Sequence, residues 1–319
     1  MLPAGAQFNP MTDSEFRMFC ELLRGHCGLH FGPESRFLLE KRIARRMAEV
    51  DVGSFAAYHY LLRSERDGAQ EMANAIDELT TNETYFFREL SPLRALINEI
   101  IPEFQRSSQR PVTIWSAGCS SGEEPYTVLM LAREAGLEPG RDIHVYASDI
   151  SRRVLQKARR GVYREASFRD TDAYYREKYF VEKDGSHAVC DEVKRHVDFI
   201  HLNLIDRSKL AILGTMDVIL CRNVVIYFDT ETKRQVVRTF HDKLSPGGYL
   251  LMGHSESLLN LSNEFELKHL ANDMVYRKPL VGEETSSRWH SVAETAIERV
   301  EDAAPAAGAR PLPSWKRER

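Results

Sequence analysis

Apolar runs of strand length alternate with helical patterns between residues 111 and 280, and this alternation constrains the fold more than any other feature of the chain. The runs expected to form strands are 111–117, 142–149, 196–204, 216–223 and 247–255, and the helical patterns are 123–136, 151–161 and 229–244. Apolar strands that alternate with helices predict a parallel, doubly wound sheet, because such strands are buried on both faces. The segment 264–279 is expected to add two antiparallel strands that close the sheet.

The N-terminal part of the chain carries helical patterns and no strand-like alternation. Expected helices are 12–28, 35–50, 54–63 and 69–80. The first is expected to begin near Thr12, Asp13 and Ser14 and to end at Gly25 or Gly28. The second is expected to align one apolar stripe, made of Phe37, Leu38, Ile43, Ala44 and Met47. We predict an all-helical domain over residues 1–80, with a linker to about residue 90, and an α/β domain over residues 81–280.

Two segments depart from these patterns. Residues 163–197 interrupt the alternation, and Asp184-Gly185 is a hairpin signal between two short strands, which predicts a small antiparallel β-insertion. After Leu280 the composition shifts to alanine and proline, which predicts a disordered tail over residues 281–319.

Composition excludes several classes of protein. The net charge is −4, from 43 basic and 47 acidic residues, which argues against a general nucleic-acid binder. The five cysteines are scattered without a CxxC pair, which argues against a disulfide framework or a zinc site. We find neither a signal-peptide pattern nor an apolar run near the ~20 residues that a membrane helix needs. A cytoplasmic protein without direct membrane insertion is expected.

The segment WSAGCSSGEEP, residues 115–125, places a glycine turn between a strand and a helix. It matches neither the dinucleotide fingerprint nor the P-loop, and its two glutamates would repel a phosphate. A ligand with a cationic group or ribose hydroxyls would be attracted, and Gly118 and Gly122 would let the backbone approach it. We expect Glu123 to face this ligand and Glu124 only to favour the helix N-terminus through the dipole.

Asp149 ends the second strand, where an acidic side chain can hold a ribose diol by two hydrogen bonds. Its alternative role is to cap the helix that follows. Ser151 already occupies the cap position, so we favour ribose binding.

The linker segment, TNETYFFRE over residues 81–89, mixes polar side chains with three aromatic residues. It is either an interdomain hinge held by its aromatics or a segment that folds over a ligand. In the second case Arg88 presents a bidentate fork to a carboxylate.

Further polar residues follow buried strands, at the edge where ligands bind in such sheets. Arg222 and Asn223 end one strand, with Tyr227 in the loop beyond, and Asn203 ends another. Cys119 and Cys221 are expected to be packing residues, because no histidine is placed by motif to activate either thiol.

The motifs NETYFFRE, WSAGCSSGEEPYT, ASDIS, CRNVVIYFD and LSPGGYLLMGHSESL occur in this order. Together they closely resemble the chemotaxis receptor methyltransferases, the CheR family, and the resemblance covers about residues 12–280. It implies a class I S-adenosylmethionine methyltransferase domain of Rossmann-like α/β fold, preceded by an all-α domain. It also implies methyl transfer from S-adenosylmethionine to glutamate side chains of methyl-accepting chemotaxis receptors, which yields glutamyl methyl esters and S-adenosylhomocysteine.

The resemblance also assigns residues. By motif position, the cofactor site comprises Asn82, Thr84, Arg88, Glu123, Asp149, Asn203, Leu204, Arg222 and Asn223. Arg88 and Tyr227 lie nearest the methyl acceptor and act as the catalytic pair. A glutamate carboxylate, with a pKa near ~4.3, is already ionised at neutral pH, so the reaction needs no general base and no metal.

The second expected helix carries Lys41, Arg42, Arg45 and Arg46 at helical spacing. Such a run is either a solvated surface or, given the resemblance, a basic face that steers glutamate-bearing receptor helices. The two interpretations stay open.

Family members that tether to a receptor C-terminal pentapeptide carry a longer, glycine-richer loop in the β-insertion. The hairpin VEKDGSHAVC is short and has a single glycine, so we predict a protein that does not need this tether. A monomer is also expected. Two other functions stay open: methylation of another protein carboxylate, and a binding module that senses S-adenosylmethionine without turnover. Arg88 and Tyr227 argue against the sensor, which has no use for an acceptor-facing pair.

Overall fold

The computed structural model describes residues 9–66 and 68–282. The expected tail therefore lies, from residue 283 onward, outside the described residues.

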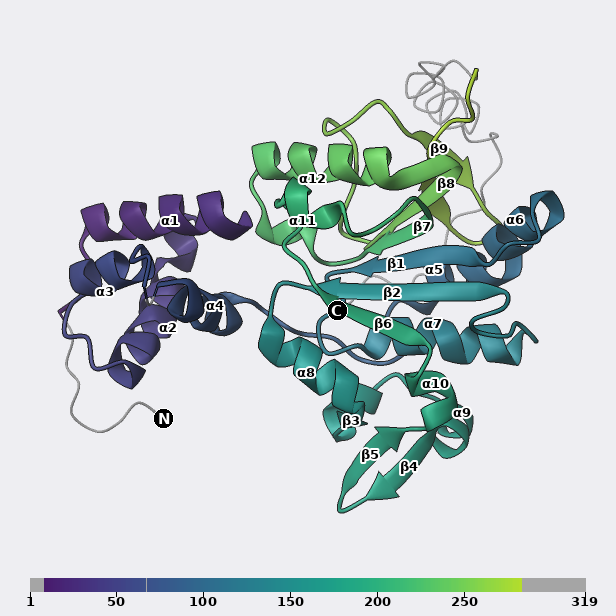
Figure 1. Ribbon diagram of the computed structural model, residues 1–319, viewed down its shortest axis with the longest axis horizontal. Helices are drawn as coiled ribbons and strands as arrows, with labels where there is room; N and C mark the ends of the chain where they lie inside the picture. The colour runs from purple at the N-terminus through teal and green to yellow at the C-terminus, as the bar shows by residue number, and fades with distance from the viewer. Residues whose placement is uncertain (1–8, 67, 283–319) are drawn as a thin grey trace, which may run out of the picture. The chain divides into compact units, whose positions relative to one another are not determined.

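The N-terminal part consists of four packed helices (Figure 1). They are α1 (Asp13–Cys27), α2 (Arg36–Glu49), α3 (Phe55–Leu62) and α4 (Gly68–Leu79), with a short 3₁₀ turn, η1 (Pro33–Ser35), before α2. The Thr12 hydroxyl accepts the Glu15 N–H while the Glu15 carboxylate accepts the Thr12 N–H, which confirms the expected start of α1. Gly28 ends this helix with a φ of 78°, so the second of the two expected ends is correct.

The apolar face of α2 differs from the expected stripe. Leu39, Ile43 and Met47 are buried, whereas Phe37 is 76% exposed and Leu38 is 42% exposed. The buried residues follow strict i, i+4, i+8 spacing, which turns the two preceding apolar side chains away from the core. The expectation for Phe37 and Leu38 was wrong.

The α/β part contains a seven-stranded sheet of order β6-β2-β1-β7-β8-β10-β9. Its strands are β1 (Val112–Ala117), β2 (Ile143–Asp149), β6 (Val197–His201), β7 (Met216–Cys221), β8 (Leu244–Met252), β9 (Glu266–His269) and β10 (Met274–Arg277). The first five are parallel, and β10 and β9 complete the sheet as antiparallel strands, as expected. After β1 the chain adds β2 and β6 on one side and then β7 and β8 on the other side. The strand order therefore has a switch point between β1 and β7, and ligands are expected at the carboxyl ends of these strands.

Helices connect the strands and pack on the sheet. They are α5 (Leu90–Ala95), the π-helix η2 (Leu96–Ile100), α6 (Ile101–Ser107), α7 (Glu123–Glu134), α8 (Arg152–Arg160), α11 (Arg207–Leu210), η4 (Val225–Tyr227) and α12 (Thr230–Lys243). Trp115 of β1 meets Phe240 of α12 with ring centroids 5.5 Å apart, while Ile114 belongs to the cluster that includes α7. Neighbouring residues of β1 therefore contact helices on different faces of the sheet.

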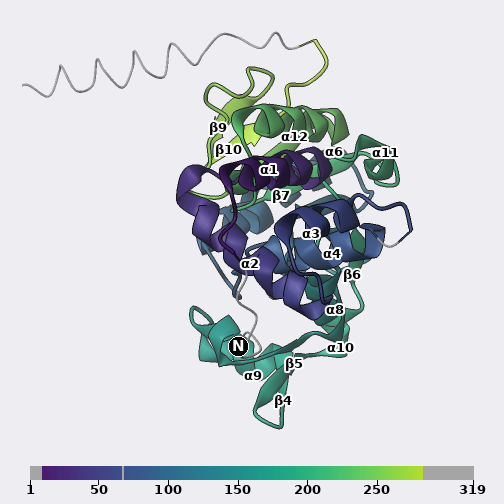
Figure 2. The same ribbon diagram turned by 90° about the vertical axis from the view of Figure 1, so that its left-hand side faces the viewer.

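A second, three-stranded sheet of order β3-β5-β4 confirms the expected β-insertion. It contains β3 (Val162–Tyr163), β4 (Phe180–Lys183) and β5 (Ser186–Val189), together with η3 (Glu165–Phe168), α9 (Ala173–Tyr179) and α10 (Asp191–Lys194). Asp184 and Gly185 both have positive φ, 51° and 69°, as a two-residue hairpin turn requires. Figure 2 shows the N-terminal helices facing the viewer, with the insertion below them. No helix in the described ranges is long and apolar enough to cross a membrane.

Candidate functional site

A cavity lies at the carboxyl ends of β1, β2 and β7, beneath the linker segment. The empty space in and around it, its open mouth included, is about 1040 Å³. Of the expected cofactor and catalytic residues, those that line it are Asn82, Thr84, Arg88, Asp149, Asn203, Leu204, Arg222, Asn223 and Tyr227. Four segments far apart in sequence thus meet at one place.

Glu123 is the expected site residue that the structure does not bring to the cavity. Its carboxylate is buried, accepts hydrogen bonds from Ser121 Oγ (2.8 Å) and Ser167 Oγ (3.0 Å), and lies 3.7 Å from the Lys157 ammonium. Glu124 lines the cavity instead. The two glutamates open α7 as consecutive residues, so their side chains point in directions about 100° apart.

Glu124 is held by the sheet. Its carboxylate accepts hydrogen bonds from Ser116 Oγ at 2.7 Å and from Arg222 Nη1 at 2.9 Å. Sequence reasoning assigned this residue only to the helix dipole, because nothing in the local pattern distinguishes it from Glu123.

The two glycines of the turn serve close packing within the protein. Gly118 has a φ of 81°, and a Cβ there would lie 2.5 Å from a methyl group of Val224. Gly122 has a φ of 92°, and a Cβ there would lie 2.9 Å from that of Ala158. Both positions therefore exclude a side chain through conformation and contact alike.

Asp149 joins the glycine turn to α8 at the edge of the cavity. Its two oxygens accept backbone N–H groups of Ser120 and Ser151, each at 2.8 Å. Burial raises the pKa of this carboxyl to about 6. Ser151 Oγ accepts the Val154 N–H and caps α8, as expected. Each Asp149 oxygen keeps a further lone pair that a ribose hydroxyl can use.

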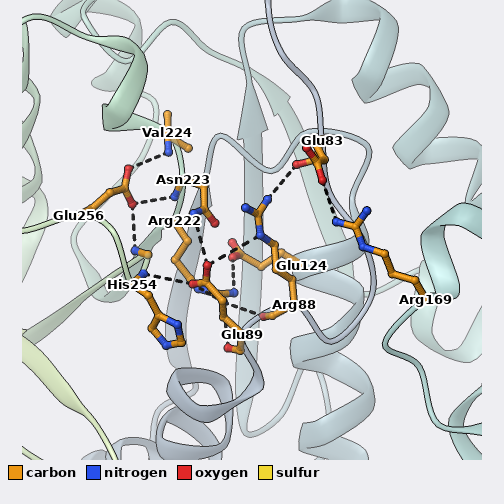
Figure 3. Close-up of polar contacts among 11 residues, drawn as sticks. Glu83, Arg88, Glu89, Glu124, Arg169, Arg222, Asn223, Val224, His254 and Glu256 are labelled. Carbon is orange, nitrogen blue, oxygen red and sulfur yellow. Dashed lines mark hydrogen bonds and ion pairs between the residues drawn. The ribbon is translucent and has the colours of Figure 1, made fainter. Parts of the chain in front are cut away.

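Arg222 ties the linker segment to the sheet (Figure 3). Its side chain is 3% exposed. Besides the bond to Glu124, Nη2 donates to the backbone carbonyls of Arg88 (2.7 Å) and Glu89 (2.9 Å). Its Nε is buried without a hydrogen-bond partner in the described part of the chain. Burial raises the pKa of the Glu89 carboxyl, but the Arg222 charge, the His254 backbone N–H and charge and the Asn223 amide together lower it more, so the net pKa lies below its ordinary value.

The linker segment contacts both the core and the cavity. Phe86 and Phe87 are buried in the core, as in a hinge held by aromatics. The polar side chains of Asn82, Thr84 and Arg88 line the cavity. Arg88 Nη1 donates to the Glu83 carbonyl at 3.0 Å, and its Nε lies 3.9 Å from the Glu89 carboxylate.

Sequence reasoning missed several cavity residues. Cys27 and Leu29 line it from the end of α1, and Asn203 Nδ2 donates to the His26 carbonyl at 2.6 Å. These contacts join segments more than 170 residues apart, so no local pattern could indicate them. Burial raises the pKa of the Cys27 thiol to about 12 and that of Cys119 and Cys221 well above its usual range. These thiols are therefore packing groups at neutral pH.

The basic residues of α2 divide into two groups. Arg46 points inward, since its guanidinium bonds to the buried carboxylate of Glu71 at 2.8 Å, and Tyr58 donates to the same carboxylate at 2.5 Å. Lys41, Arg42 and Arg45 instead line a shallow hollow on the surface, where they meet Arg153 of α8 and residues 80–82. Arg46 is thus not part of the basic face, and Arg45 is ion-paired with Glu78, which lines the same hollow.

Family models and curated relatives point to one family. A family model described as "CheR methyltransferase, SAM binding domain" matches residues 82–273, and one described as "CheR methyltransferase, all-alpha domain" matches residues 14–80. The chain is 38% identical over 277 residues to chemotaxis protein methyltransferase 2 of Vibrio cholerae serotype O1, covering 85% of this chain and 95% of that protein. It is 35% identical to the chemotaxis protein methyltransferase of Salmonella typhimurium, covering 81% and 88%. A solved magnesium protoporphyrin IX methyltransferase from Synechocystis PCC 6803 with bound SAM has a TM-score of 0.33 and 13% identity, with 70% of this chain and 88% of that chain covered.

Proposed function

The chain belongs to the CheR methyltransferase family and is an S-adenosylmethionine-dependent methyltransferase of chemotaxis, and from this premise we propose that its methyl acceptors are glutamate side chains of methyl-accepting chemotaxis receptors. The products are glutamyl methyl esters and S-adenosylhomocysteine. The observation that carries the proposal is the convergence of Arg88 and Tyr227 on a cavity whose other polar residues suit the cofactor.

The cavity fits S-adenosylmethionine by the chemistry of its lining. Asp149 offers acceptors to ribose hydroxyls, and the Glu124 carboxylate complements a cation. The Nε of Arg222, which has no hydrogen-bond partner among the described residues, offers a donor to an anionic group. We assign Asn82, Thr84, Asn203, Leu204 and Asn223 to the same site, together with Glu124 in place of Glu123. When bound, the cofactor supplies a sulfonium methyl group, which passes to a carboxylate oxygen as the carbon–sulfur bond breaks.

Arg88 and Tyr227 orient the acceptor. A glutamate carboxylate is ionised at neutral pH, so the protein has no proton to remove and needs neither a general base nor a metal. Arg88 holds one carboxylate oxygen through its guanidinium, and Tyr227 restricts the position of the carboxylate from the opposite loop. Catalysis then comes from alignment and from exclusion of water around the acceptor.

The partner is the cytoplasmic methylation helix of a chemoreceptor, with no nucleic acid involved and with the enzyme a cytoplasmic monomer. Lys41, Arg42 and Arg45 support this assignment, because they lie beside residues 80–82 at the cavity margin and attract a glutamate-bearing helix. The two-residue turn at Asp184 and Gly185 supports independence from a pentapeptide tether, since the hairpin is short.

The proposal is tested with labelled cofactor. Purified enzyme is incubated with tritiated S-adenosylmethionine and the cytoplasmic domains of candidate receptors. Base-labile label on a receptor domain is expected, because glutamyl methyl esters hydrolyse in base. Arg88→Ala should abolish most of this label, whereas Arg106→Ala on the exposed surface of α6 should not.

Two results would contradict the proposal. Base-stable label would identify another acceptor chemistry. Cofactor binding without label on any receptor domain would favour a sensor of S-adenosylmethionine.

A further inference from the structure

We propose that Arg169, a residue of the β-insertion, is a positioning residue for Arg88. This inference rests on the proposed function, in which Arg88 holds the methyl acceptor. It assigns to the insertion a role at the cavity itself, through direct contact with the linker segment.

Arg169 contacts two residues of the linker segment. Its Nη2 donates to the Glu83 carboxylate at 2.8 Å, and its guanidinium carbon lies 3.7 Å from the centre of the Tyr85 ring. This combination fixes a planar guanidinium by one directional bond and one stacked face. The hydrogen bond to Arg169 also lowers the pKa of the Glu83 carboxyl, which keeps it ionised at neutral pH.

Arg88 uses the same two residues. Its Nη1 donates to the Glu83 carbonyl at 3.0 Å, and its guanidinium carbon lies 5.6 Å from the centre of the Tyr85 ring. Figure 3 shows Glu83 between Arg88 and Arg169, with interactions drawn to both. A shift of Glu83 or Tyr85 therefore changes the surroundings of the Arg88 guanidinium directly.

The insertion holds the neighbouring backbone as well. The Phe86 N–H donates to the Ser167 carbonyl at 2.9 Å, and the Phe86 ring stacks on Phe168 with centroids 5.3 Å apart. Residues 167–169 thus contact the linker segment through backbone, aromatic ring and guanidinium. The linker segment needs this support, because Phe87 and Glu89 both have positive φ, at 61° and 45°.

The Arg169–Glu83 pair is too exposed to matter much for global stability. The two side chains are 47% and 64% exposed, and ion pairs of this kind contribute little to unfolding free energy. A loss of activity on removing Arg169 would therefore report local positioning and not unfolding.

The test compares Arg169→Ala with Arg176→Ala in the full chain. Arg176 is a matched control, because it also bonds to a carboxylate (Glu165, 2.8 Å) and lies over a ring (Phe168), yet its contacts stay within the insertion. Arg169→Ala should lower kcat for receptor methylation roughly tenfold, as expected for a small misplacement of a catalytic group. Arg176→Ala should leave kcat within about twofold, and both should keep the melting temperature of the unchanged protein.

Three further measurements separate positioning from a structural role. Amide hydrogen exchange over residues 82–89 should accelerate in Arg169→Ala and not in Arg176→Ala. Arg169→Lys should restore part of kcat, because the charge returns without the planar fork. Glu83→Gln should reproduce part of the loss, and the double variant should be no worse than Arg169→Ala, because Arg169→Ala already removes the bond to Glu83.

The outcomes are distinct. If Arg88→Ala leaves turnover unchanged, the role of Arg88 in the proposed function fails and this inference fails with it. If Arg88→Ala lowers turnover and Arg169→Ala changes neither kcat nor exchange over residues 82–89, only this inference is overturned. An equal loss in Arg169→Ala and Arg176→Ala would also overturn it.

Discussion

The Glu256 carboxylate accepts the backbone N–H of Asn223 at 2.7 Å, where the Asn223 backbone lies in the left-handed region with a φ of 59°. The same carboxylate accepts N–H groups of Val224 (2.9 Å), Ile226 (3.3 Å) and Gly253 (2.9 Å). One side chain therefore holds the turn between β7 and η4 together with η4 itself, and these bring Asn223 and Tyr227 to the cavity.

We predict that Glu256→Gln slows methyl transfer. An amide has one acceptor oxygen, and its NH₂ group would face backbone N–H donors. The donors left unpaired should lower the free energy of unfolding by about 1–3 kcal/mol. The expected result is a lower kcat together with a lower melting temperature, measured by the tritiated-methyl assay and by calorimetry. Glu231→Gln is the control, because the Glu231 side chain is 86% exposed. Unchanged kcat in Glu256→Gln would show that the turn holds its position without this carboxylate.

Cofactor affinity should depend on pH through Asp149. Burial raises the pKa of Asp149 to about 6 in the folded protein, so the carboxylate that accepts ribose hydroxyls is lost as the pH falls through that value. S-adenosylhomocysteine should bind about tenfold more weakly at pH 5 than at pH 7.5 if only the ionised form binds. Calorimetric titration at several pH values measures this, and Asp149→Asn should give weaker binding with a flat pH profile. A sloping profile in that variant would assign the titration to another group.

The raised pKa of Asp149 also affects the stability of the free protein. The free protein should become more stable as the pH falls, whereas its cofactor affinity should decrease. The pKa of Asp149 is raised on folding, so its contribution to stability is fully present below pH about 4 and is lost as the pH rises through about 6. Bound S-adenosylhomocysteine should reduce this loss, because its hydroxyls stabilise the ionised form. Melting temperatures of Asp149→Asn and the unchanged protein, measured with and without the product, test this coupling.

The two glutamates at the start of α7 should respond differently to substitution. Glu124→Gln should weaken S-adenosylhomocysteine binding more than about tenfold, because it breaks the buried pair with Arg222 at the cavity wall. Glu123→Gln should lower the melting temperature and leave the affinity within about twofold, because its partners are Ser121, Ser167 and Lys157. Calorimetric titration of both variants measures which glutamate contributes to cofactor binding. A larger affinity loss in Glu123→Gln would support the assignment of Glu123 made from the sequence.

Substitutions of the basic residues of α2 should have different effects on stability and on activity. Arg46→Met leaves the buried Glu71 carboxylate without its charge partner, and this should destabilise the protein by about 3 kcal/mol or more. Lys41→Glu changes an exposed residue, so the melting temperature should hold while receptor methylation slows at low salt. Initial rates at two ionic strengths test the steering role, and full activity of Lys41→Glu at low salt would exclude it.

Independence from a receptor tether is a prediction from the short β4–β5 hairpin. Calorimetric titration with C-terminal receptor pentapeptides should give no binding in the micromolar range. Micromolar affinity would contradict it, and truncation of the receptor C-terminus would then lower the methylation rate.

Several expectations followed from local chemistry and were confirmed. The cap at Thr12, the end at Gly28, the hairpin turn at Asp184 and the cap at Ser151 each depend on a few adjacent residues. The predictions of a parallel sheet, a small antiparallel sheet and an all-α N-terminal part were also confirmed. The spacing of apolar residues along the chain indicates which elements are buried on two faces. The domain limits and the role of each site residue stay predictions.

Other features depended on which way a side chain turns. Glu123 and Glu124 are adjacent and chemically alike, and only the placement of α7 against β1 decides that Glu124 lines the cavity. Arg46 joins the core of the N-terminal helices although it belongs to a basic run, because Glu71 of α4 lies beside it.

The sequence by itself determined the main strands and helices of the two parts, several turn and cap residues, and the motifs that identify a methyl-donor site. These depend on short-range sterics and on hydrophobic period, which adjacent residues carry. Only the tertiary structure decided which carboxylates face the cavity, that Cys27 and Leu29 of the helical part line it, and that Arg169 of the insertion contacts the linker segment. Such contacts join residues distant along the chain, and their geometry is set by how whole elements pack.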